Sequence, residues 1–135
     1  MIEPIRTVLC VDDDEDDREL VCDTINNIDP HIKVVHAENG VEAIDYLLKA
    51  QIEGDLPCLI IMDINMPQMD GKEALAVIKK NEDLIDLPVV IFSTSNSEID
   101  KLYCSNFGVN LITKPNDIKS LHKEIKSVLH HCGDS

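Results

Sequence analysis

Several polar side chains that could do chemistry follow apolar runs of the sequence. The residues that share this placement are Asp12, Asp13, Asp63, Ser93, Thr94 and Lys114. Carboxylates gathered in one cleft repel one another unless a cation neutralises them. Oxygen ligands with an incomplete shell suit Mg²⁺, which keeps bound waters and takes phosphate oxygens. The sequence therefore predicts a Mg²⁺ site at which Asp63 is a candidate phosphate acceptor.

Asp63 has the most informative position of these residues. It follows an apolar run over 58–62, and a loop that contains Pro67 comes after it. A run of this kind is typical of a strand that is buried on both faces. In open α/β sheets, ligands bind where the carboxyl ends of the strands lie. We therefore expect Asp63 to be functional rather than structural.

Each of these residues also has a simpler interpretation. The acidic run 12–17 could cap a helix and interact favourably with its dipole, and we favour this interpretation for Asp16 and Asp17. Lys114 could be a surface lysine before a proline turn, and Ser93 could be a loop hydroxyl. Their placement together, each after a predicted strand, favours one shared site.

The elements that would position these residues alternate along the chain. Short apolar and β-branched runs predict strands over 7–11, 33–37, 58–62, 89–92 and 110–113. After each strand, apolar residues recur at helical spacing, in the ranges 20–28, 41–48, 75–78, 99–103 and 118–129. Candidate N-caps are Asn39, Asp70 and Ser97. This alternation predicts an α/β fold with a parallel sheet and helices on both faces, but it does not determine the strand order.

Composition limits the class of protein. A chain of 135 residues fits one domain with its own core, and with 3% aromatic residues that core must come from aliphatic side chains. The formal net charge of −14 repels phosphate backbones and anionic lipid. We therefore expect no direct binding to nucleic acid or membranes, and partners that are cations or basic protein surfaces.

The cysteines and the apolar runs bear on the compartment. The five cysteines are odd in number, form no C-x-x-C motif and mostly fall in apolar runs: Cys10, Cys22, Cys58, Cys104 and Cys132. We expect them to be reduced core residues. No stretch has the length of a signal peptide or a membrane span, so the expected location is the cytoplasm.

Taken together, the motifs resemble those of the receiver domain of two-component response regulators, over nearly the whole chain. The segments that carry the resemblance are Asp12-Asp13, Met62-Asp63-x-x-Met66-Pro67-x-x-Asp70-Gly71, Pro88 leading to Ser93, and Lys114-Pro115. Within that family, the single-domain regulators associated with phytochrome-type kinases are the most similar. The segments that carry this finer likeness are Asn65, Phe92-Ser93-Thr94-Ser95 and Lys114-Pro115.

The resemblance implies a fold and a domain organisation. The fold would be the flavodoxin-like, three-layer (βα)5 doubly wound parallel sheet with strand order 2-1-3-4-5. Residues 1–135 would form one receiver domain with no output domain. Signalling would then go through protein contacts, on the face made by the fourth helix, the fifth strand and the last helix.

The resemblance also implies a role for each site residue. Asp63 would accept a phosphoryl group from a sensor histidine kinase or a phosphotransfer protein, so that the chain is a signalling protein rather than an enzyme. Mg²⁺ would be held by Asp13, Asp63 and the backbone carbonyl of Asn65, with Asp12 acting through a bound water. Lys114 would pair with the phosphoryl oxygens, and Ser93, on the same loop as Thr94, would donate a hydrogen bond to them.

One position departs from the pattern of the resembled family. The aromatic residue usual on the fifth strand is replaced by Leu111. A leucine has apolar bulk but no hydroxyl that could reach the surface. We therefore expect a smaller rearrangement on phosphorylation, reported by Tyr103 and Phe107 instead.

Three alternatives remain open. A small Mg²⁺-dependent phosphatase would need an Asp-x-Asp acid and a cap over its substrate, whereas Asp63-Ile64-Asn65 places an amide at the second position. An interaction module that is never phosphorylated would not need every pocket residue that is present here. The run His130-His131-Cys132 could bind a metal, although adjacent residues rarely converge on one ion and we expect this tail to be frayed.

Overall fold

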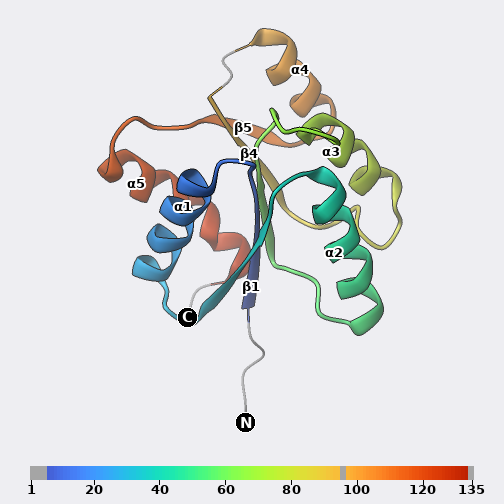
Figure 1. Ribbon diagram of the computed structural model, residues 1–135, viewed down its shortest axis with the longest axis horizontal. Coiled ribbons are helices and arrows are strands. Elements are labelled where there is room, and N and C mark those ends of the chain that lie inside the picture. The colour runs from blue at the N-terminus through green and yellow to red at the C-terminus, as the bar shows by residue number, and fades with distance from the viewer. Residues whose placement is uncertain (1–5, 95–96, 134–135) are drawn as a thin grey trace.

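The computed structural model describes residues 6–94 and 97–133, and it contains one five-stranded parallel sheet (Figure 1). The strands are β1 (Arg6–Val11), β2 (Ile32–Ala37), β3 (Leu59–Met62), β4 (Val89–Ser93) and β5 (Asn110–Thr113). The helices are α1 (Glu15–Ile28), α2 (Gly40–Glu53), α3 (Gly71–Lys80), α4 (Glu98–Asn106), α5 (Ile118–Val128) and the short 3₁₀ helix η1 (Leu129–Cys132). The strand order is β2-β1-β3-β4-β5, which confirms the flavodoxin-like fold.

The helices cover both faces of the sheet. Figure 1 shows α1 and α5 on one side and α2, α3 and α4 on the other. Each side has its own apolar cluster, and β3 contributes to both: Ile60 and Met62 pack into one, Leu59 and Ile61 into the other. All four side chains are buried, so the predicted strand with two buried faces is confirmed.

Three helices, α2, α3 and α4, begin at the caps that the sequence predicts, whereas the caps of α1 and α5 were not predicted. Asn39 accepts a hydrogen bond from the backbone N–H of Glu42, and Asp70 accepts one from that of Glu73. Such caps satisfy N–H groups that lack partners inside the helix. The C-caps of α1 and α3 are Asp29 and Asn81.

Some apolar residues that the helical spacing assigns to the core lie at the surface instead. Ile99 and Leu102 of α4 are 74% and 63% exposed, and Ile118 of α5 is 69% exposed. The spacing shows which helix face is apolar, but only packing shows how much of that face the sheet covers. Among the described residues, no helix is both long and apolar enough to cross a bilayer.

The expectations for the cysteines and the tail need correction. Cys58 and Cys132 are joined by a disulfide, so these two are not reduced core residues. Cys10 and Cys104 are free and buried as expected, and Cys22 is half-buried. The segment 129–132 is not frayed, because it forms η1 and buries Leu129 and Cys132 against α5 and β3. Since Cys132 is cross-linked, the metal site considered at residues 130–132 lacks its thiolate.

Candidate functional site

The carboxyl ends of β1 and β3 lie next to each other and bring three acids together. Val11 and Met62 are paired in register, so Asp12 and Asp63 leave adjacent strands at the same edge. The Asp63 N–H donates to the Val11 carbonyl at 2.9 Å, which fixes the start of the loop. Carboxylate oxygens of Asp12, Asp13 and Asp63 lie within 4.8 Å of one another, with Asp12 and Asp63 buried and Asp13 exposed.

Lys114 supplies the positive charge of this group. Its Nζ donates to Asp12 Oδ2 at 2.7 Å and to Asp63 Oδ2 at 3.2 Å. Burial works against the charged lysine, but the hydrogen bonds to Asp12 and Asp17 and the charge of Asp63 outweigh it, so the pKa of Lys114 is raised. The side chain is 14% exposed, and it stays positively charged at the end of β5.

Burial also acts on Asp12. It raises the pKa of this carboxyl, although hydrogen bonds from Lys114 and from the Asp14 N–H work in the opposite direction. The Arg18 side chain donates to the Asp12 carbonyl at 2.7 Å, so a second cation lies close to the acidic loop. Lys114 therefore pairs with the desolvated carboxylate of Asp12, and Arg18 binds the backbone carbonyl of the same residue.

Asp17 is a site residue that the sequence interpretation missed. We predicted that it serves α1 as a first-turn acid, but its Oδ2 also accepts from Lys114 Nζ at 2.9 Å. Helical side chains tilt toward the N-terminus of their helix, so an acid in the first turn reaches back over the preceding loop. That tilt, combined with the position of Asp17 directly after the acidic loop, is the signal that could have identified it.

Gly71 holds the Asp63 loop in place. Its N–H donates to the Ile64 carbonyl at 2.8 Å, which joins the start of α3 to the loop. A Cβ at this position would lie 2.2 Å from the Asp63 carbonyl oxygen, so only glycine fits. The Asn65 N–H donates to Asp63 Oδ1 at 3.3 Å and helps to orient the carboxylate.

The hydroxyl residues lie at the end of β4. Ser93 is fully buried and closes the strand, one residue later than predicted, and its carbonyl accepts from the Lys114 N–H at 2.8 Å. Thr94 follows it and is exposed. Ser95, which we included in the same hydroxyl-rich segment, lies outside the described residues.

A separate set of contacts joins α4 to the start of α3. The Tyr103 hydroxyl donates to the Lys72 carbonyl at 2.7 Å, and the Lys72 ammonium forms an ion pair with Asp100. The Tyr103 ring packs edge-on against Phe107, with 5.2 Å between the ring centroids. Leu111 is paired with Ile91 and packs, half-buried, against the same apolar cluster. Of the predicted aromatic reporters, Tyr103 therefore contacts the helix that begins at the Asp63 loop, and Phe107 packs against Tyr103.

The donor set is suitable for a hard divalent cation. All three acids offer oxygen, which Mg²⁺ prefers, and the exposure of Asp13 leaves room for bound water. Within the described part of the chain, this is the one group of acid, histidine or cysteine side chains close enough to share an ion. Asn65, predicted to contribute its backbone carbonyl, is exposed on the loop that follows Asp63.

Several known proteins are similar to this chain in sequence and in fold. The response regulator Rcp1 of Synechocystis sp. is 32% identical over 131 residues, which cover 93% of this chain and 87% of Rcp1. A crystal structure of the phosphorylated cyanobacterial phytochrome response regulator RcpA has 32% identity and a TM-score of 0.84, covering 93% of this chain and 91% of that one. A crystal structure of the Mn²⁺-bound form of response regulator Rcp1 has 31% identity and a TM-score of 0.79, and the match covers 93% of this chain and 92% of that one.

The family comparison covers most of the chain. Residues 8–126 match the response regulator receiver domain, a range that includes every proposed site residue. The resemblance seen in the motifs is thereby confirmed. This chain belongs to the family of response regulator receiver domains.

Proposed function

We propose that this chain is a phosphoacceptor response regulator and that Asp63 receives the phosphoryl group. The observation that carries the proposal is the meeting of Lys114 Nζ with Asp12 and Asp63, at 2.7 and 3.2 Å, beside the group of three acids. A nucleophilic carboxylate next to a fixed cation suits phosphoryl transfer, which depends mainly on positioning and charge neutralisation.

The donor in this proposal is a phosphohistidine of a sensor histidine kinase or a phosphotransfer protein. An Asp63 carboxylate oxygen attacks the phosphorus, a P–O bond forms, the P–N bond breaks, and the histidine nitrogen keeps the electron pair. Asp63 is already a carboxylate when it pairs with Lys114, so no separate general base is needed. Lys114 then moves its hydrogen bonds from the carboxylates to the phosphoryl oxygens.

Asp12, Asp13, Asp63 and the Asn65 backbone carbonyl would hold Mg²⁺, with Asp12 contributing through a water. The bound ion would supply charge neutralisation at the phosphoryl oxygens. The acidic oxygens of the group support this assignment, and so does the Mn²⁺-bound form of the relative Rcp1. The protein's own part is to keep Asp63 oriented through Asn65 and Gly71.

The signal would leave through the face made by α4, β5 and α5. Phosphorylation adds about two negative charges beside Asp63. The Ser93 hydroxyl is fully buried, so it can donate to a phosphoryl oxygen only if the end of β4, with Thr94, shifts. The exposed Ile99, Leu102 and Ile118 give this face apolar side chains for a protein partner.

Incubation with acetyl phosphate and Mg²⁺, followed by intact mass measurement, tests the proposal. The expected result is the addition of one phosphoryl group that requires Mg²⁺ and is abolished in Asp63→Asn, which keeps the shape of the side chain but removes the nucleophile. Asp16→Asn, which alters an exposed acid of the same loop and helix, is the matched control and should be phosphorylated normally.

Two results would contradict the proposal. Phosphorylation that persists in Asp63→Asn would move the acceptor to another residue. Release of many equivalents of phosphate per chain would instead support the phosphatase alternative.

A further inference from the structure

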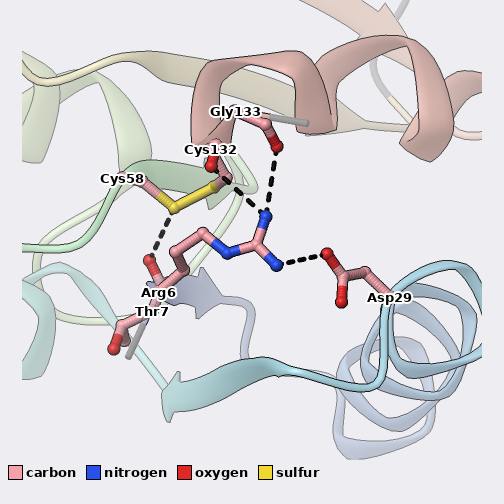
Figure 2. The surroundings of a disulfide bond; sticks show 6 residues. All are labelled: Arg6, Thr7, Asp29, Cys58, Cys132 and Gly133. Carbon is pink, nitrogen blue, oxygen red and sulfur yellow. Dashed lines mark hydrogen bonds and ion pairs between the residues drawn. A yellow bond between two sulfur atoms is a disulfide. The ribbon is translucent and has the colours of Figure 1, made fainter. Parts of the chain in front are cut away.

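The amino edge of the sheet, opposite Asp63, contains the disulfide between Cys58 and Cys132. The two residues are 74 positions apart, and their Cα atoms are 5.0 Å apart, a separation at which a disulfide needs no backbone movement. Cys58 directly precedes β3, and Cys132 ends η1. Figure 2 shows the bond between the start of the strand and the last turn of the helical segment.

Polar contacts surround the cross-link on the side of η1. Arg6 donates to the carbonyls of Cys132 and Gly133, at 3.4 and 3.1 Å, and forms an ion pair with Asp29 at 2.6 Å (Figure 2). The Cys58 N–H donates to the Thr7 carbonyl, and Cys58 Sγ lies 3.2 Å from the same oxygen. A reduced Cys58 therefore has an acceptor for its S–H in its present position.

The surrounding packing does not depend on the cross-link. Leu121, Ile125 and Val128 of α5 are buried against the sheet, and Leu129 extends the same cluster into η1. Reduced Cys132 can remain in that cluster as a small apolar side chain. Both oxidation states are therefore compatible with the fold, and the difference between them is confined to the last turn.

We propose that Cys58 and Cys132 form a reversible modification site for low-molecular-weight thiols and disulfides, separate from the proposed phosphorylation site. Cys58 is half-buried and Cys132 is buried, so an incoming thiolate reaches Cys58 before Cys132. Oxidation pins η1 to the start of β3. Reduction frees η1 and leaves Asp63 and its neighbours as they are.

Reduction of the Cys58–Cys132 bond by thiol–disulfide exchange takes two steps. A small thiolate attacks Cys58 Sγ, a mixed disulfide forms, and Cys132 leaves as a thiolate that takes a proton from water. A second small thiolate attacks the small molecule's sulfur in the mixed disulfide, which releases Cys58 and a small-molecule disulfide. Two electrons thus pass from two small thiols to the protein disulfide, and the reverse sequence restores it.

The three remaining cysteines differ in how readily they could react with small thiols and disulfides. Burial, followed by the charge of Asp12, raises the pKa of the Cys10 thiol to about 12, which leaves almost no reactive thiolate. Cys104 is buried as well, and burial raises its pKa. Cys22 is half-buried and free, so Cys22→Ser is the matched control for replacement of a cysteine.

The test equilibrates the full chain in buffers of graded reduced to oxidised glutathione, quenches with acid, alkylates free thiols and maps them by mass spectrometry. The expected result is a Cys58–Cys132 linkage that forms and disappears reversibly across the series. Hydrogen exchange should then be faster at 129–133 in the reduced protein, and the Tm should fall by about 5–12 °C. Cys132→Ser should abolish these responses, whereas Cys22→Ser should keep them.

Three results would overturn the proposal. These are an alkylated Cys58 in the fully oxidised protein, a linkage that glutathione cannot reduce while the chain is folded, and a reductant response that persists in Cys132→Ser. The glutathione series on the wild-type chain tests the proposal without any variant, so misfolding of Cys132→Ser would not prevent the test. Phosphoryl uptake from acetyl phosphate should be the same in both redox states. Absence of uptake in both states would count against the proposed function and not against this site.

Discussion

The carboxyl edge and the amino edge of the sheet are stabilised by different kinds of contact, although the single strand β3 runs from one edge to the other. At the carboxyl edge, Asp63 meets Lys114 through a hydrogen bond and charge. At the amino edge, Cys58 is covalently joined to Cys132. Ionic contacts can be redistributed when a new anion or cation arrives, whereas a covalent bond changes only by chemical reaction. The comparison separates the edge at which we propose phosphorylation from the edge at which we propose thiol–disulfide exchange.

The largest expected effect comes from Gly71→Ala, which would disrupt the carboxyl edge alone. The added Cβ would lie 2.2 Å from the Asp63 carbonyl oxygen, and the next nearest atoms, of Asp63 and Ile64, are also backbone atoms that no side-chain rotation can move. We expect the free energy of unfolding to fall by about 3 kcal/mol, with lower phosphoryl uptake and an unchanged disulfide. Urea denaturation and intact mass measure both effects.

The control for that substitution is Gly54→Ala. Gly54 has a φ of 70° and no atom within 4 Å of an added Cβ, so only backbone strain of about 1 kcal/mol is expected. A loss at Gly71 no larger than the loss at Gly54 would contradict the close approach to Asp63.

Lys114→Met should make the carboxyl edge more dependent on metal. Without Lys114, the buried carboxylates of Asp12 and Asp63 lose their counter-charge, so stability without divalent cations should fall by about 2 kcal/mol. Mg²⁺ should then raise the Tm of the variant more than that of the wild type. Lys49→Met, on the exposed side of α2, is the control, and equal Mg²⁺ responses in all three proteins would show that Lys114 does not neutralise the site.

Tyr103→Phe should weaken the contact between α3 and α4 without affecting phosphorylation at the carboxyl edge. It removes the hydrogen bond to the Lys72 carbonyl, at an expected cost of about 1 kcal/mol, without altering phosphoryl uptake. The chain has two tyrosines and no tryptophan, so Tyr46→Phe leaves Tyr103 as the fluorescent reporter. Its emission should change when acetyl phosphate and Mg²⁺ are added, and an unchanged emission would show that phosphorylation does not reach α4.

The smallest expected effect is at the amino edge, where Asp29→Asn should remove a pH-dependent contribution to stability. The His31 N–H, and then Arg6, hold the pKa of Asp29 below its ordinary value. A lowered pKa in the folded state stabilises above the ordinary pKa, and that stabilisation is lost as the pH falls through the folded value. The Tm difference from wild type should thus be present at pH 7 and shrink below about pH 4. Asp45→Asn, on the exposed face of α2, is the matched control for replacement of a surface aspartate.

Local patterns in the sequence were sufficient to predict the strands, the main helices and the edge of the sheet where the candidate site residues meet. The apolar run of β3, followed at once by Asp63, is visible without tertiary information because a strand buried on both faces needs consecutive apolar residues. The caps at Asn39 and Asp70 involve N–H groups only three residues away. The strand order came from the family resemblance, since alternation of strands and helices is compatible with several orders.

The contacts that join distant segments were decided by the tertiary structure. Lys114 reaches Asp12 across 102 positions of the sequence, and its further contact with Asp17 depends on how α1 packs against α5 and the sheet. The Cys58–Cys132 bond, missed because an odd number of cysteines in apolar runs suggested reduced thiols, spans 74 positions. Residue type and spacing show which groups can react, but which groups meet depends on the packing of helices against the sheet, because that packing brings segments far apart in the chain within bonding distance.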